Sequence, residues 1–136
     1  MSEDRVLKVA ADTEKLHEVL DFVTALLEEH DCPIKTQLLI EVSLEELFVN
    51  IARYAYPEGK GWAEIHASVE DGVLTVTLID GGIPYNPLAK PDPDVTLSAE
   101  EREIGGLGIY MVKKKMDEMT YEYRDSHNIL KISKKL

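Results

Sequence analysis

The chain has 136 residues, 44% hydrophobic and 30% charged, which is ordinary for a single folded domain. Its formal net charge of −11 disfavours direct binding to nucleic acid or to an anionic membrane, because both usually need a basic surface. The sequence contains no apolar stretch of about 18 residues and no secretory leader, and Cys32 is its only cysteine, so cytoplasmic residence is expected.

The first third of the chain predicts a strand and two helices. Residues Arg5–Ala10 are rich in β-branched and apolar side chains and predict a strand. Asp12 can cap a helix that extends to about His30. His17 lies on that helix, and we interpret it as a surface histidine rather than a phosphoacceptor. A second helix is expected from about Pro33 to Tyr54, since proline suits a first helical turn.

The rest of the chain alternates strand signals with one long irregular segment. Asp71-Gly72 is a strong hairpin signal between two strands. A mobile lid is one interpretation of the proline-rich residues from about 85 to 104, and a disordered spur is the other. The expected elements are a loop at 57–61, strands at 62–70 and 73–79, a possible short helix near Ser98–Glu101, a helix at 107–116, strands at 118–123 and 129–133, and a turn at 125–128. This order predicts a two-layer α/β sandwich with a largely antiparallel sheet.

The second helix carries polar side chains beside its core face. At about 100° per residue, the predicted core face comprises Ile40, Leu44, Leu47, Phe48, Ile51 and Ala55. A second stripe on its flank comprises Ser43, Glu46, Asn50, Arg53 and Tyr54. Glu46 and Asn50 are one turn apart and therefore neighbours. Glu46 could be a plain exposed carboxylate or pair with Arg53, and Asn50 could be a core amide satisfied by backbone.

Two further segments have residue types that suit a nucleotide. Asp80-Gly81-Gly82 ends an apolar strand, where the aspartate could start a turn or accept a hydrogen bond from an exocyclic amine. Gly105-Gly106-Leu107-Gly108 begins a helix, whose free N–H groups attract anions, although glycines are also common at tight turns.

Together, these segments resemble the Bergerat-fold (GHKL) ATPase superfamily, in which an E-x-x-x-N box, a D-x-G box, a lid and a glycine box follow in that order. Within it, Val42–Tyr56 and Gly106–Tyr110 followed by Met116-Asp117 resemble the small stand-alone anti-sigma factor serine kinases. The resemblance extends from about Val6 to Lys134. It implies an α+β fold across residues 1–136, with a mixed, mostly antiparallel sheet covered by about three helices on one face, as in a histidine-kinase-like ATPase domain.

The resemblance also implies ATP and Mg²⁺ as ligands and a role for each box residue. Glu46 would be the general base and Asn50 the Mg²⁺ ligand. Asp80 would accept from the adenine amine, and Gly82 would let the ring approach. The full set of implied nucleotide-binding residues is Asn50, Arg53, Tyr54, Asp80, Gly82, Gly105, Gly106, Leu107 and Gly108.

The function implied is a protein-serine kinase that phosphorylates an anti-sigma antagonist of the STAS type, sequesters a sigma factor and forms a homodimer. The alternative is a nucleotide-gated binding protein with little or no transfer. A histidine-kinase catalytic domain is a weaker interpretation, because no dimerising phosphoacceptor segment is found. Two departures from the superfamily pattern are Ile104 in place of a glycine and Ser126-His127-Asn128 in place of a late Gly-Thr. Both are expected near the phosphates, where they would affect turnover more than adenine binding.

Overall fold

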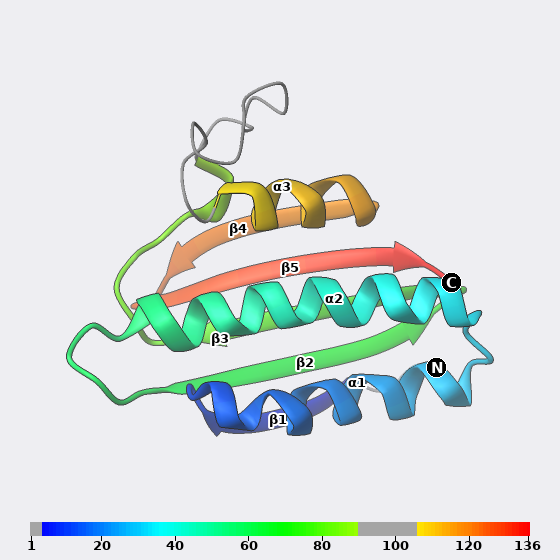
Figure 1. Ribbon diagram of the computed structural model, residues 1–136, viewed down its shortest axis with the longest axis horizontal. Coiled ribbons are helices and arrows are strands. Elements are labelled where there is room, and N and C mark those ends of the chain that lie inside the picture. The colour runs from blue at the N-terminus through cyan, green and yellow to red at the C-terminus, as the bar shows by residue number, and fades with distance from the viewer. Residues whose placement is uncertain (1–3, 90–105) are drawn as a thin grey trace.

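A five-stranded sheet with helices on one face forms the protein (Figure 1). The computed structural model describes residues 4–89 and 106–136. In chain order the elements are β1 (Arg5–Ala10), the 3-10 helix η1 (Thr13–Lys15), α1 (Leu16–Glu29), α2 (Ile34–Asn50), the π-helix η2 (Ile51–Ala55), β2 (Trp62–Glu70), β3 (Val73–Asp80), the 3-10 helix η3 (Pro87–Ala89), α3 (Gly106–Lys115), β4 (Glu118–Arg124) and β5 (His127–Lys135).

The predicted α+β two-layer sandwich is confirmed. The strands are ordered β1-β2-β3-β5-β4. All four pairings among these described strands are antiparallel, so this sheet is antiparallel and not mixed. The predicted lid begins within the described residues, where 87–89 form η3. The remainder of the predicted lid, including Ile104 and the predicted short helix near Ser98–Glu101, lies outside them.

Local sequence signals account for both hairpins. Asp71 and Gly72 adopt φ values of 53° and 74°, the left-handed conformations that a two-residue hairpin turn requires. Asp125 and Ser126 do the same at 53° and 63°. The turn predicted at 125–128 is therefore two residues too long. Asn128 belongs to β5, where it pairs with Asp80 on one side and Tyr123 on the other.

The core lies between the helices α1, α2 and α3 and the inner face of the sheet. Strand β2 alternates as predicted, with the side chains of Ala63, Ile65, Ala67 and Val69 buried. All six residues of the predicted core face of the second helix are buried as well. The flank that carries Glu46 and Asn50 is thereby oriented toward β3, β5 and α3, because a helix buried along one stripe cannot rotate about its axis.

The last turn of the second helix differs from the prediction. The α-helix ends at Asn50, and residues Ile51–Ala55 continue it as a π-helix. A π turn has one more residue per turn than an α turn and is frequent at functional sites. The carbonyl of Ala55 then accepts a hydrogen bond from the backbone N–H of Ile83 at 2.9 Å, which ties the end of this helix to the segment after β3.

Gly82 makes that junction possible. A Cβ atom added at Gly82 would lie 2.2 Å from the carbonyl oxygen of Ala55, which is backbone and cannot move aside cheaply. We expect Gly82→Ala to lower the free energy of unfolding by about 2 to 3 kcal/mol, the usual cost of overpacking. Urea denaturation would measure it. The matched control is Gly81→Ala, where the Cβ would lie 3.1 Å from the Trp62 ring and the cost should stay below about 1 kcal/mol. Equal midpoints for the two variants would contradict this account.

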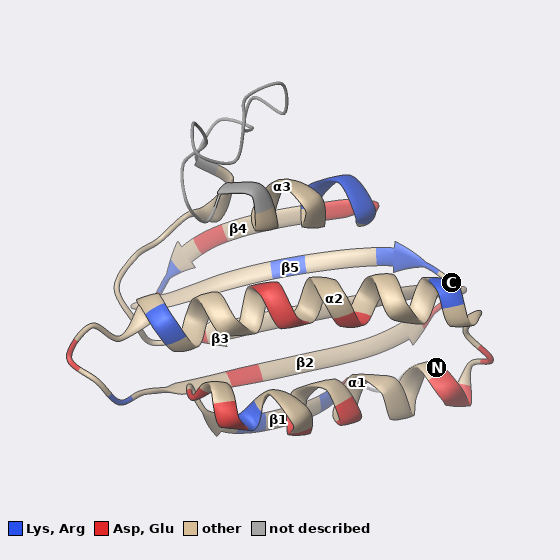
Figure 2. Cartoon of the chain, viewed as in Figure 1, with Lys and Arg blue, Asp and Glu red and all other residues tan. Residues whose placement is uncertain are grey.

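Acidic positions occur along α1 and α2, whereas basic positions occur at the last turn of α3 and at the end of β5 (Figure 2). Three lysines, Lys113 to Lys115, occupy the last turn of α3, where cations interact favourably with the helix dipole. None of the described helices is both long and apolar enough to cross a bilayer. The described residues also contain no group of three or more histidine, cysteine or acidic side chains that could hold a metal ion by themselves.

Candidate nucleotide-binding site

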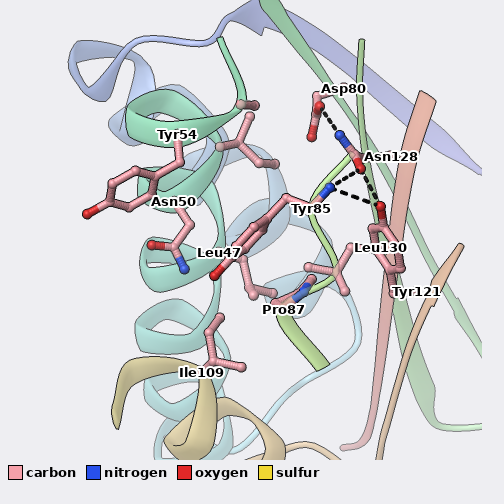
Figure 3. A pocket seen from close by; sticks show the side chains of 12 residues that line it. Leu47, Asn50, Tyr54, Asp80, Tyr85, Pro87, Ile109, Tyr121, Asn128 and Leu130 are labelled. Carbon is pink, nitrogen blue, oxygen red and sulfur yellow. Dashed lines mark hydrogen bonds between the residues drawn. The ribbon is translucent and has the colours of Figure 1, made fainter. Parts of the chain in front are cut away.

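A pocket lies between the C-terminal half of α2 and η2 on one side and the ends of β3, β4 and β5 on the other (Figure 3). Residue Ile109 of α3 and two residues of the segment after β3 complete its walls. The lining residues are Leu47, Asn50, Ile51, Tyr54, Ala55, Asp80, Tyr85, Pro87, Ile109, Tyr121, Asn128 and Leu130. The structure thus brings together three of the predicted residues, Asn50, Tyr54 and Asp80, from separate parts of the chain.

Asp80 is the buried carboxylate of this pocket, with only 4% of its surface exposed. Its Oδ1 accepts two hydrogen bonds, from the backbone N–H of Gly82 and from Nδ2 of Asn128, each at 2.9 Å. Oδ2 has no hydrogen-bond partner within the described residues. Burial raises the pKa of Asp80 above its ordinary value, although these two hydrogen bonds and the nearby His127 act in the opposite direction. One acceptor oxygen is therefore left for a ligand with an N–H donor.

Asn128 is the main site residue that the sequence prediction missed. Its side chain is 5% exposed and uses all four of its hydrogen-bonding positions. Nδ2 donates to Oδ1 of Asp80 and to the carbonyl of Ile83, at 2.9 and 2.8 Å. Oδ1 accepts from the Tyr121 hydroxyl at 2.5 Å and from the Tyr85 backbone N–H at 3.1 Å.

In the sequence, Asn128 was noted as part of the Ser126-His127-Asn128 departure from the superfamily pattern. The prediction placed this residue in a turn, whereas Asn128 belongs to strand β5. The residue does not lie in a turn near the phosphate end of the site. The β3–β5 register sets Asn128 opposite Asp80, so this departure bears on the acceptor end of the pocket. Ile104, the second departure, lies outside the described residues.

Two tyrosines also line the pocket, and no sequence pattern singled them out. The Tyr121 hydroxyl donates to Asn128, and burial raises the pKa of Tyr121. Tyr85 is 39% exposed, and Figure 3 shows its ring drawn between α2 and the strands. The cavity has a volume of about 40 Å³, which is room for a few water molecules but not for a purine ring. Tyr85 is the lining side chain best placed to move aside, because it is carried by a loop and its hydroxyl has no hydrogen-bond partner within the described residues.

Tyr56 holds the corner at which Asp80 ends its strand. Its hydroxyl donates to the carbonyl of Trp62 at 2.5 Å and accepts from the backbone N–H of Gly81 at 2.8 Å. Its ring lies over Gly61, where an added Cβ would overlap it at 2.2 Å. Burial is the main cause that raises the pKa of Tyr56, so the hydroxyl stays protonated and can donate. The carboxylate of Asp80 is thus oriented by a backbone that is anchored on both sides.

The polar stripe of α2 divides between two neighbouring hollows. Asn50 and Tyr54 line the pocket, although Figure 3 shows the Tyr54 ring directed away from its centre, and this side chain is 53% exposed. Glu46 and Arg53 line a groove between α2 and α3. Because Glu46 and Asn50 are one helical turn apart, the groove continues from the pocket along the same helix.

The glycine-rich start of α3 meets Glu46 in this groove. A Cβ atom added at Gly108 would lie 2.0 Å from Oε1 of Glu46, so a side chain there would displace the carboxylate from this position. Gly106 is the first residue of α3, and the free backbone N–H groups of a helical first turn suit phosphate oxygens. Gly105 lies outside the described residues, and the side chain of Leu107 is not described.

Gly82 packs against the end of η2. It is absent from the residues that line the pocket, and a side chain there would meet the backbone of Ala55. Its contribution to the pocket is the backbone N–H that it donates to Asp80.

The arrangement suits a flat heterocycle that carries an amine and is attached to phosphates. The amine would meet Oδ2 of Asp80 at one end, and the phosphates would extend past Asn50 toward Glu46 and Gly108. A comparison with curated proteins found no match. A family model described as a histidine kinase-like ATPase domain matches residues 9–134. That match spans every element from η1 to β4, together with the last two residues of β1 and all of β5 except its last residue. The chain therefore belongs to the family of histidine kinase-like ATPase domains.

Proposed function

We propose that this protein is a cytoplasmic anti-sigma regulatory factor, a protein-serine kinase that uses ATP and Mg²⁺ to phosphorylate an antagonist of the STAS type. Family membership implies ATP as the ligand. One observation carries the kinase proposal: Glu46 and Asn50 lie one turn apart on α2, at the junction of the Asp80 pocket with the groove that ends at Gly108. This position supports the proposal that the carboxylate and the carboxamide act on the phosphates of a nucleotide bound through Asp80.

The residues present suit each step of such a transfer. Asn50 would hold Mg²⁺ through its side-chain oxygen, and the bound ion would neutralise charge on the phosphates. A single amide suffices, because Mg²⁺ commonly keeps several waters and takes its other ligands from phosphates. Glu46 would take the proton of the attacking hydroxyl as the oxygen–phosphorus bond forms and ADP departs. Arg53, which lines the same groove, could reach a phosphate.

The second candidate is a nucleotide-gated protein that sequesters its partner without phosphoryl transfer. The small volume of the pocket favours this second candidate. A bound nucleotide would have to displace a side chain such as Tyr85, so nucleotide binding would change the shape of the surface around the pocket. The position of Asn128 weakens it, because that departure lies at Asp80 and not at the phosphates. Under either candidate we propose a homodimer that binds a sigma factor and contacts neither nucleic acid nor membrane directly.

Incubation with γ-labelled ATP and a STAS-type antagonist encoded nearby tests the proposal. The expected result is label on one serine of the antagonist, dependent on Mg²⁺ and lost when that serine is replaced by alanine. A complex that forms only with nucleotide but carries no label would support the second candidate instead. Absence of both label and nucleotide-dependent complex would contradict both candidates.

We expect Asn50→Ala to lower the affinity for Mg-ATP at least about tenfold, because the ion loses its only ligand proposed from the protein. Calorimetric titration with and without a chelator of Mg²⁺ would measure it. The chelator should weaken binding in the wild type and have little further effect in the variant. Gln37→Ala is the matched control, since this amide lies on the same helix outside the pocket and bonds to Glu41. A variant that stays fully sensitive to the chelator would remove Asn50 as the ligand.

A further inference from the structure

The side chain of Asn128 donates a hydrogen bond to Asp80, the proposed acceptor for the adenine amine. None of the roles proposed above involves Asn128. We infer that Asn128 is a positioning residue which holds Asp80 so that the site selects purines with an amine at position 6 over purines with an oxygen there. This inference rests on the proposed function, because it concerns how the same pocket tells ATP from nucleotides such as ITP.

The first step of the argument is that Asn128 sets which oxygen of Asp80 faces the ligand. Its Nδ2 and the backbone N–H of Gly82 both donate to Oδ1, so that oxygen is saturated by the protein (Figure 3). Oδ2 is then the oxygen without a partner in the described residues. Because the described residues contain no fully buried side-chain oxygen without a partner, Oδ2 is accessible, and as a free carboxylate oxygen it favours a ligand donor and disfavours a ligand acceptor.

The second step is that the orientation of the Asn128 amide is itself determined by its partners. Its Oδ1 faces two donors, the Tyr121 hydroxyl and the Tyr85 N–H, and its Nδ2 faces two acceptors, Asp80 and the Ile83 carbonyl. A flipped amide would set oxygen against two acceptors and nitrogen against the Tyr85 N–H donor. Only one orientation satisfies all four contacts, so the donor is always presented to Asp80.

The third step concerns the charge of Asp80. Burial favours its protonated form, and the hydrogen bond from Asn128 opposes that effect. A protonated carboxyl could donate to a 6-oxo group, which would remove the discrimination. The other titratable groups that act on Asp80 are His127 of β5, Tyr121 of β4 and Tyr56 after η2. Of these, His127 favours the charged form of Asp80 as Asn128 does, but among the described side chains it is Asn128 that donates a hydrogen bond to the carboxylate.

The test compares the binding of Mg-ATP and Mg-ITP, which differ at position 6 of the purine and share ribose and phosphates. We expect the wild type to bind ATP at least about 30-fold more tightly than ITP, and Asn128→Ala to reduce this ratio to about threefold or less. Asn128→Leu has a similar volume and no donor to Asp80, so its ratio should fall as well. Thermal unfolding of each variant shows whether it is folded.

The matched control is Asn86→Ala, because Asn86 is an exposed asparagine that does not line the pocket and that, among the described residues, accepts a hydrogen bond only from the Leu88 N–H. Its ATP-to-ITP ratio should equal that of the wild type. A second readout is pH, since loss of the Asn128 donor should move the fall in ATP affinity on acidification to higher pH. A merely structural role would lower both affinities equally and leave the ratio unchanged, which would overturn the inference. Failure of the wild type to bind ATP at all would overturn the proposed function together with it.

Discussion

Asp80→Asn is expected to lower the affinity for Mg-ATP by about 10- to 100-fold, because hydrogen bonds to a charged group contribute about 1.5 to 3 kcal/mol. Oδ1 of the new amide can still accept from Gly82 and Asn128, which fixes its nitrogen at the place of Oδ2. The pocket would then present a donor to the adenine amine, which is also a donor. Calorimetric or fluorescence titration with Mg-ATP measures the loss.

Stability is expected to change in the opposite direction, and this separates a binding defect from misfolding. The pKa of Asp80 is raised in the folded protein, so the folded state binds a proton more readily than the unfolded chain does. Stability attributable to this group is therefore fully present below the unfolded pKa and is lost as the pH rises through the folded value. At neutral pH the wild type bears that cost, and the neutral amide does not.

Asp80→Asn should consequently be as stable as the wild type at neutral pH, or more stable, and its stability should vary less with pH above about pH 4. Thermal unfolding as a function of pH would measure both. A variant that is less stable at neutral pH would show that the hydrogen bonds to the carboxylate outweigh its burial. Unchanged ATP affinity would remove Asp80 as the acceptor for the base.

Glu46→Gln is expected to keep the affinity for Mg-ATP within about threefold and to slow phosphoryl transfer by about 100- to 10,000-fold, the usual contribution of a general base. Glutamine has nearly the same shape, so it fits against Gly108 in the half-buried place of the carboxylate. An amide cannot take the proton of the attacking hydroxyl. Single-turnover measurement with labelled ATP and the antagonist separates binding from transfer.

The control for this substitution is Glu28→Gln on α1, an exposed glutamate on a helix that does not line the pocket. It should leave both binding and transfer at wild-type values. Transfer at the normal rate in Glu46→Gln would exclude Glu46 as the base. Equal loss of binding and transfer would instead assign Glu46 to nucleotide positioning.

Some parts of the fold follow from short-range signals, and these predictions are confirmed. The bounds of β1 at Arg5–Ala10 agree with the predicted strand, and β2 alternates as expected because one of its faces is buried. The predicted hairpin at Asp71-Gly72 is present, and both residues have the left-handed conformation that its turn requires. The apolar face of α2 is correct over all six residues, since helical periodicity depends only on residues a few positions apart.

Predictions near the site were less complete where a distant partner decides the local geometry. The π turn at Ile51–Ala55 coincides with a hydrogen bond from Ile83, which no helical pattern in the sequence reports. The space around Gly82 is set by Ala55, 27 positions earlier in the chain, which no local pattern in the sequence reports. Tyr85 and Tyr121 line the pocket, and both donate a hydrogen bond to Asn128. No sequence motif marks an aromatic residue that lines a pocket in this way.

The sequence by itself determined the family, the two hairpins and the polar stripe of α2, because motif order, turn residues and periodicity are local properties. It also placed Glu46, Asn50 and Asp80 among the residues that matter, through a resemblance that the family match supports. Only the tertiary structure decided what Asp80 contacts. The β3–β5 pairing brings Asn128 beside a carboxylate 48 positions away, and a register set by the packing of two whole strands cannot be deduced from either residue alone.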